Sequence, residues 1–179
     1  MKRLICILAM LLLCSTAIAQ DQKPLLKERK FSFAINYRAG ISVGSYDKII
    51  ETGEYRINND GKFYNYVTLD FNYAISPKWE VGLAIGVYDT KLDVWRIPLY
   101  ANAQYFFNDR TRGWFNYVDV GANIRVGGCP GSLAGFGGGY RLYIADKFKM
   151  DFTLGYMHNY SPQIPTYQSA IQLGVALVF

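Results

Sequence analysis

The sequence predicts an all-β fold: a membrane-spanning, eight-stranded, antiparallel up-and-down β-barrel whose lumen is filled by side chains. Apolar residues occupy every second position over most of residues 31–179, and this alternation continues to the final residue, Phe179. Aromatic residues make up 16% of the chain, yet the mean hydropathy is only +0.02. Membrane barrels combine these properties, because each strand is apolar only on the face that meets lipid.

The first residues predict export. Lys2 and Arg3 form a positive segment, an apolar stretch follows, and Ala17 and Ala19 give the small-residue pattern of a cleavage site. The apolar stretch is too short for a membrane helix and is typical of a secretory signal peptide. We therefore expect three segments, namely a cleaved signal peptide at 1–19, a short periplasmic lead-in at 20–30 and the outer-membrane barrel at 31–179.

Cysteine and charge exclude several classes of function. Cleavage would remove Cys6 and Cys14 and leave Cys129 alone, so neither an intrachain disulfide nor a cysteine metal site is expected. It would also remove Lys2 and Arg3, which lowers the formal net charge from +5 to +3. No basic block indicates a nucleic-acid partner, and we expect no cofactor.

The strands follow from the alternation, taken in chain order. In residues 31–44 the odd positions are apolar and the even positions are polar or small. Pro98, in the fourth strand, is expected to mark a bulge or a strand start, because a closed sheet has no free edge for proline. The sixth strand is rich in glycine and is the least regular. The strands after the first are expected at about 63–75, 79–87, 95–105, 118–126, 136–145, 148–156 and 170–179.

The connections alternate in length. Short turns are expected near 76–78, 108–113 and 146–147, and longer loops at 45–62 and 158–167. Outer-membrane barrels have short periplasmic turns and longer outer loops, so both chain ends are expected on the periplasmic side. A soluble β-sandwich would bury the same alternation, but it rarely places so many aromatic residues near strand ends.

Aromatic residues near the strand ends predict two girdles at the membrane interfaces. Trp79, Trp114, Phe148 and Phe179 lie near the short-turn end, and Trp95 lies toward the other end. A barrel has no open edge only when its last strand pairs with its first. The alternation therefore has to continue to the C-terminus.

Three stretches resemble the small outer-membrane β-barrel domain family found widely in Bacteroidota: DFNYAISPKWEVGLAIG, IPLYANAQYFF and the closing GVALVF. The resemblance implies an integral protein of the outer membrane, and we expect a monomer in contact with outer-membrane lipids and lipopolysaccharide. The C-terminal strand that ends in Phe179 also resembles the signal by which the barrel assembly machinery recognises its clients. The family is defined by its barrel, so the resemblance leaves the activity open.

Charged residues at inward positions are expected to fill the lumen as an ion-pair network, because an eight-stranded barrel is only wide enough for side chains. Glu80 and Lys149 are expected at the periplasmic end, and the others nearer the middle. The predicted network is Arg38, Asp70, Glu80, Asp119, Arg141, Lys149 and Asp151.

Two further inward cations, Arg96 and Arg125, are expected near the outer rim. A cationic rim attracts anionic groups such as the phosphates of lipopolysaccharide. The loop acids Asp89 and Asp93 are alternative partners for the same arginines.

The only catalytic candidates are His158, the single histidine, and Ser161. Outer-membrane lipid A deacylases use a histidine, a serine and an orienting acid at the outer leaflet, which is the usual nucleophilic arrangement. Here the spacing differs from the His-x-Ser of those enzymes, and no acidic residue follows His158. The Gly-rich stretch 126–140 lacks the Lys-Ser/Thr of a phosphate-binding loop.

The sequence therefore predicts a non-enzymatic barrel with a structural, surface-interaction or small-ligand-binding role. A lipid-modifying enzyme of the outer leaflet is the first alternative. A narrow passive pore is the second, which the nearly balanced charge of the lumen disfavours.

Overall fold

The computed structural model describes residues 30–48, 55–57, 63–89, 96–125, 130–145, 148–161 and 166–179. Outside these residues lie the whole expected signal peptide, the lead-in except for Lys30, and Asp93, Trp95 and Cys129. The structure also does not describe the side chains of the candidates Arg125 and Ser161. Within the described ranges, no helix is long and apolar enough to cross a membrane.

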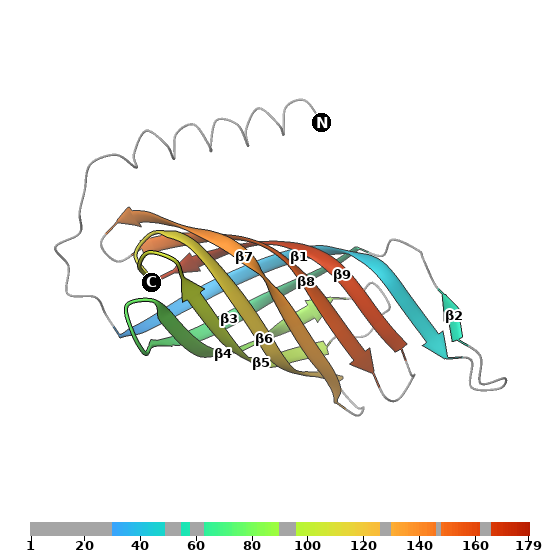
Figure 1. Ribbon diagram of the computed structural model, residues 1–179. Coiled ribbons are helices and arrows are strands. Elements are labelled where there is room, and N and C mark those ends of the chain that lie inside the picture. The colour runs from blue at the N-terminus through green and yellow to red at the C-terminus, as the bar shows by residue number, and fades with distance from the viewer. Residues whose placement is uncertain are drawn as a thin grey trace.

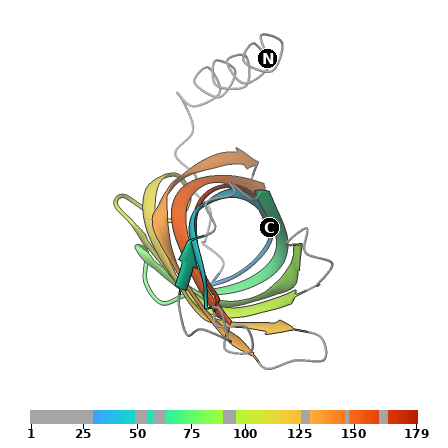
Figure 2. The same cartoon turned by 90° about the vertical axis from the view of Figure 1, so that its right-hand side faces the viewer.

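The described residues form a closed antiparallel barrel, which confirms the predicted fold class (Figures 1 and 2). Each wall strand pairs with the next along the chain, and the last pairs with the first. The strands are β1 (Phe31–Lys48), β2 (Tyr55–Ile57), β3 (Phe63–Ala74), β4 (Trp79–Asp89), β5 (Arg96–Phe106), β6 (Gly113–Arg125), β7 (Gly131–Ala145), β8 (Phe148–Ser161) and β9 (Thr166–Val178).

The short strand β2 is the main departure from the predicted topology. It lies within the connection expected at 45–62, and it pairs only with the end of β1, through Tyr46–Lys48. β1 itself continues to Lys48, beyond the last strongly alternating residue. The barrel wall therefore consists of β1 and β3 to β9, and β2 extends it at one end (Figure 1).

Pro98 lies inside β5 and is fully buried. The pairing of β5 with β4 is interrupted at Ile97 and Pro98. It is present at Leu99 and at Arg96 on either side, and the register is the same at both. Of the two alternatives expected at Pro98, the bulge is wrong, because the proline removes a bond to one neighbour without inserting a residue. The strand start lies close to it, since β5 begins at Arg96. Register shifts occur instead between Ser42 and Gly44 and between Tyr143 and Ala145.

The outside of the barrel is apolar and the inside is polar. This division follows from strand alternation, because a barrel of this size has one face toward its surroundings and one toward the lumen. Large side chains exposed on the outside include Phe31, Ile35, Ile41, Leu69, Phe71, Leu83, Ile85, Val118, Val120, Leu154, Ile171 and Leu173.

Inward glycines make room for the large side chains of the lumen. An added Cβ at Gly121 would overlap the carbonyl oxygen of Leu99 and the Cα of Tyr100, which are backbone atoms that cannot turn aside. We expect Gly121→Ala to lower the free energy of unfolding by about 1–3 kcal/mol. Urea unfolding of the folded barrel, followed by tryptophan fluorescence, measures this loss.

Gly44→Ala is the matched control. An added Cβ at Gly44 has no other heavy atom within 4 Å, so its unfolding midpoint should stay close to that of the wild type. Equal midpoints for the two alanine variants would contradict the steric role of Gly121.

Candidate functional site

Arg141 holds together the charged cluster at the short-turn end of the lumen. It comes from β7 and is completely buried. Its Nε and Nη2 donate to the two carboxylate oxygens of Asp151, both at 2.7 Å, and its Nη1 donates to Glu80 Oε2 at 3.0 Å. A bidentate pair with a second carboxylate satisfies a buried guanidinium well. The sequence had placed Arg141 and Asp151 nearer the middle; they lie with Glu80.

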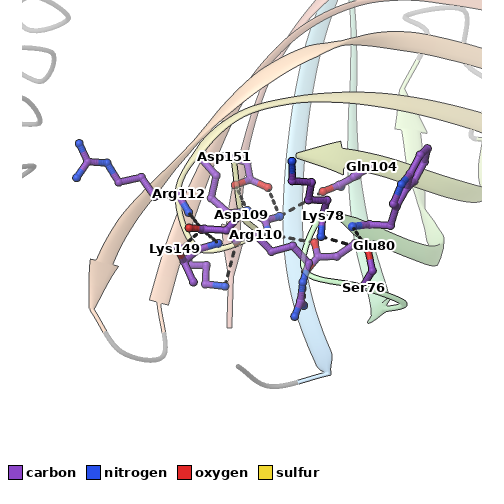
Figure 3. Close-up of polar contacts among 12 residues, drawn as sticks. Ser76, Lys78, Glu80, Gln104, Asp109, Arg110, Arg112, Lys149 and Asp151 are labelled. Atoms are coloured by element: carbon purple, nitrogen blue, oxygen red, sulfur yellow. Dashed lines mark hydrogen bonds and ion pairs between the residues drawn. The ribbon is translucent and has the colours of Figure 1, made fainter. Parts of the chain in front are cut away.

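The turn between β5 and β6 completes this cluster. Arg110 points inward from the turn, and its Nη1 donates to Glu80 Oε1 at 3.4 Å. The carbonyl oxygen of Arg110 accepts from Arg141 Nη1 at 3.1 Å and from Lys149 Nζ at 3.2 Å. Figure 3 shows Arg110 of the turn together with Glu80 and Lys149 at this mouth of the barrel. The turn therefore closes this end of the lumen.

Asp109 fixes the shape of that turn. Its Oδ1 accepts from the backbone N–H of Thr111 at 2.8 Å and of Arg112 at 3.2 Å, and from the Thr111 hydroxyl. Partial burial raises the pKa of Asp109, but these hydrogen bonds favour the charged form and lower the pKa overall. The carboxylate thereby holds the backbone that presents Arg110.

A second charged layer lies in the middle of the lumen, around Arg38 of β1. Its Nη1 contacts Asp119 Oδ2 of β6 at 2.5 Å and donates to Tyr66 Oη at 3.1 Å. The guanidinium carbon also lies 4.9 Å from the ring centroid of Tyr117 and 5.9 Å from that of Tyr100. Cation–π contacts of this kind strengthen when they are shielded from water.

Neutral polar residues extend the middle layer. Tyr66 Oη donates to Gln172 Oε1 at 2.8 Å, and Gln172 Nε2 donates to Tyr117 Oη at 3.3 Å. Asp70 accepts from Thr68 Oγ1 at 2.6 Å and from Asn36 Nδ2 at 3.3 Å. In the part of the chain described, Asp70 is thus held by neutral donors, and the predicted network divides into two clusters.

The space between the two layers is small. A cavity of about 10 Å³ lies there, and its polar lining includes Asn36, Asp70, Asn72, Gln104 and Asp151. A cavity of this size holds about one water molecule. The charged layers thus leave little open space between them.

The outer part of the lumen is closed by uncharged side chains. Tyr64, Tyr88, Asn123 and Asn159 are each at most 3% exposed. Asn123 Nδ2 donates to Asn159 Oδ1, and Tyr88 Oη donates to Gln168 Oε1 at 3.1 Å. The inward position of Arg96 is in register with Tyr88 on β4 and with Arg125 on β6.

Aromatic side chains surround the short-turn end of the barrel. The rings of Trp79 and Tyr105 are 5.0 Å apart, and those of Phe148 and Phe179 are 5.4 Å apart. Trp114 is 65% exposed on the outside of β6. The predicted girdle residues at this end thus each lie next to another aromatic ring.

His158 has a different partner from the one expected. Positions 158 and 161 differ by three, so strand alternation places them on opposite faces of β8. Across β9, His158 Nδ1 lies 3.0 Å from Ser169 Oγ, on the outward face. The strands therefore place Ser169, and not the candidate position 161, on the same face as His158.

No family model and no curated protein matches this chain. Its fold is similar to several solved structures. Ail, the attachment invasion locus protein of Yersinia pestis, is 15% identical over 85% of this chain and 100% of its own, with a TM-score of 0.48. Neisserial surface protein A is 14% identical over 80% and 95%, with a TM-score of 0.48. The N-terminal β-barrel domain of Pseudomonas aeruginosa OprF is 16% identical over 83% and 97%, with a TM-score of 0.47.

Sequence reasoning missed two parts of the lumen. Arg110 lies in a turn, where strand alternation gives no information about side-chain direction. Only its place in the short connection between two predicted strands could have suggested a role at the mouth of the lumen. The tyrosines around Arg38 do lie at alternating inward positions, but their ring contacts depend on strand register. Both groups of side chains help to fill the lumen.

Proposed function

We propose that this protein is an integral outer-membrane barrel that does not conduct, and that acts through structural and surface interactions. The observation that carries the proposal is the double closure of the lumen, by the Arg141 cluster and by the Arg38 layer. Each layer contains a buried ion pair, so opening a path would leave charges unpaired at high cost.

The outer surface supports the membrane location. Apolar side chains exposed to solvent in such numbers would make a soluble protein aggregate, whereas a closed barrel satisfies its backbone internally and can span lipid. The aromatic residues at the short-turn end fit an interface with the headgroups. The short turns then face the periplasm, and lipids and lipopolysaccharide contact the outside.

The C-terminus fits recognition by the barrel assembly machinery. Phe179 N donates to Phe33 O at 2.8 Å, and Phe33 N donates to Phe179 O at 3.2 Å. The last residue is therefore part of the closing seam of the barrel. A last strand that pairs along its whole length offers the assembly machinery a defined segment to recognise.

The proposed role is non-enzymatic. A histidine–serine pair needs a carboxylate to orient the imidazole. The carboxylates of Asp70, Glu80, Asp119 and Asp151 all lie inside the barrel, while His158 and Ser169 face outward. In the described strands, the pair is therefore a cross-strand hydrogen bond at the outer surface.

Planar-bilayer recording tests the closed lumen. We expect the purified, folded wild-type barrel to give no stepwise conductance. Arg110→Ala together with Lys149→Ala is the comparison variant, since it should loosen the periplasmic mouth and leave the Arg38 layer in place. A steady wild-type conductance, with folding verified by heat-modifiable gel mobility, would refute the proposal and favour a passive pore.

A further inference from the structure

A polar pair lies on the outward, mostly apolar wall of the barrel. His158 of β8 is in register with Ser169 of β9, and His158 Nδ1 lies 3.0 Å from Ser169 Oγ. The next outward positions toward the short-turn end carry exposed apolar side chains, among them Leu154, Ile171 and Leu173. Polar residues on the wall of a membrane barrel are tolerated best near the interfaces, so the level of the pair along the barrel matters.

The strands place this pair at the outer membrane interface. Phe148 and Phe179 belong to the aromatic girdle at the short-turn end, with ring centroids 5.4 Å apart. The pair is separated from that girdle by residues 148–158 along β8 and by residues 169–179 at the end of the chain. At about 3.3 Å per residue and a strand tilt of about 40°, this length rises about 25 Å, which is the height of the apolar band of a membrane barrel.

The hydrogen bond to Ser169 sets the chemistry of the imidazole. When Nδ1 accepts a hydrogen bond from the Ser169 hydroxyl, the ring proton lies on Nε2, and Nε2 is then a donor. The side chain of His158 is only partly buried. A donor at Nε2 can therefore reach a group at the membrane surface.

Two tyrosines border the pair on its outer side. Tyr160 and Tyr167 are in register, and their ring centroids are 4.7 Å apart. The ring of Tyr167 also lies 5.9 Å from that of His158. Tyrosine favours the membrane interface, where the ring meets apolar groups and the hydroxyl meets polar ones. The two hydroxyl groups are therefore further donors at the level of the lipid headgroups.

The neighbours of the pair in the described strands are uncharged. Ala134 of β7 is in register with His158, and Gly44 of β1 is in register with Ser169. Residues 162–165, which join β8 to β9, have the sequence PQIP and contribute no acid. A group of donors without an adjacent carboxylate favours an anionic acceptor, because hydrogen bonds to charged acceptors are the stronger ones.

We propose that His158 and Ser169 form a headgroup site on the outer face of the wall, and that it binds a phosphate monoester of an outer-leaflet glycolipid. A phosphate carries several strong acceptor oxygens, so one group can accept from His158 Nε2 and from a tyrosine hydroxyl together. The acyl chains of the same lipid lie against the exposed side chains of Ile171 and Leu173. The inference deepens the proposed surface role, and it rests on the outer end of the barrel lying in the outer leaflet.

NMR of the imidazole tests the site, because His158 is the only histidine in the chain. The full-length, isotope-labelled barrel, without a histidine tag, is folded in dodecyl maltoside, a detergent that contains no phosphate. We expect the ring proton on Nε2, and a saturable shift of the Nε2 signal on titration with diphosphorylated lipid A. The absence of this shift would overturn the proposal. An equal shift with dephosphorylated lipid A would also overturn it, because the acyl chains alone would then be the cause.

Variants that keep the wall intact identify the donor, and the phosphorus NMR signal of lipid A measures their affinity. H158F keeps an aromatic ring at the interface and should bind at least about tenfold more weakly, the loss expected for a hydrogen bond to a charged group. S169A should bind with an intermediate affinity and lose the preference for one tautomer. N116A is the control, because Asn116 is exposed on the outward face of β6 close to the short-turn end. Its affinity should equal that of the wild type, and a loss as large as that of H158F would refute a local site.

Two further results separate the source of the phosphate and the two proposals. Glycerol phosphate carries the same ester on a soluble molecule and should bind at least about a hundredfold more weakly, because it has no acyl chains to bury. Similar affinities would indicate a site for soluble ligands and overturn the lipid site. A folded, non-conducting barrel that does not bind lipid A would overturn the site and leave the proposed function intact. A conducting wild type that binds lipid A through His158 would refute the closed lumen and leave the site intact.

Discussion

Replacing Arg141 with alanine is expected to lower the free energy of unfolding by about 3–5 kcal/mol, the range for breaking a buried ion pair from one side. The variant would leave two carboxylates, those of Glu80 and Asp151, without their central partner at a site where both are at most 3% exposed. The cavity left by the side chain adds to the loss. Urea unfolding of the barrel in micelles, followed by tryptophan fluorescence, gives the difference.

Two variants test whether charge is the reason. Lys78→Ala removes an exposed cation from the same end of the barrel and should change stability by less than about 0.5 kcal/mol. Adding Asp151→Asn to Arg141→Ala removes the carboxylate that loses its bidentate partner, while Glu80 keeps its contact with Arg110, and this should restore part of the loss. If the double variant were less stable than Arg141→Ala, the unpaired charge would not be the cause.

The wall of the barrel was predictable because alternation acts locally. A period of two fixes which face each residue occupies, whatever the partner strand. Arg38, Asp119 and Arg141 were therefore assigned to the lumen without knowledge of register. The same alternation identified the outward aromatic residues, because each continues the run of apolar outward positions at the end of its strand.

The pairing inside the barrel was less predictable, because it depends on tilt and stagger. Arg38 and Asp119 are 81 residues apart in sequence, and only the closed register brings them to one level. Arg141 reaches Glu80 for the same reason, although its position along β7 suggested a place nearer the middle. The Gly-rich β7 has few large side chains to mark its length, and the three-residue β2 is too short to show alternation.

Arg38 gives the second large expected effect. Arg38→Ala should lower the free energy of unfolding by about 3–5 kcal/mol, because Asp119 would remain as a buried carboxylate without its cation. The loss of ring contacts with Tyr66, Tyr100 and Tyr117 acts in the same direction. Urea unfolding of the folded barrel measures the effect, and an unchanged midpoint would show that this layer does not stabilise the lumen.

Replacing both partners separates the two contributions. In R38M/D119L no charge remains, and a methionine can still pack against the tyrosine rings. Replacing a buried ion pair with apolar residues of similar volume is often neutral or stabilising, so the double variant should recover most of the stability that Arg38→Ala loses. A double variant as unstable as Arg38→Ala would mean that geometry specific to the guanidinium, its bond to Tyr66 included, dominates. Recovery would mean that the ion pair closes the lumen without being required for the barrel to fold.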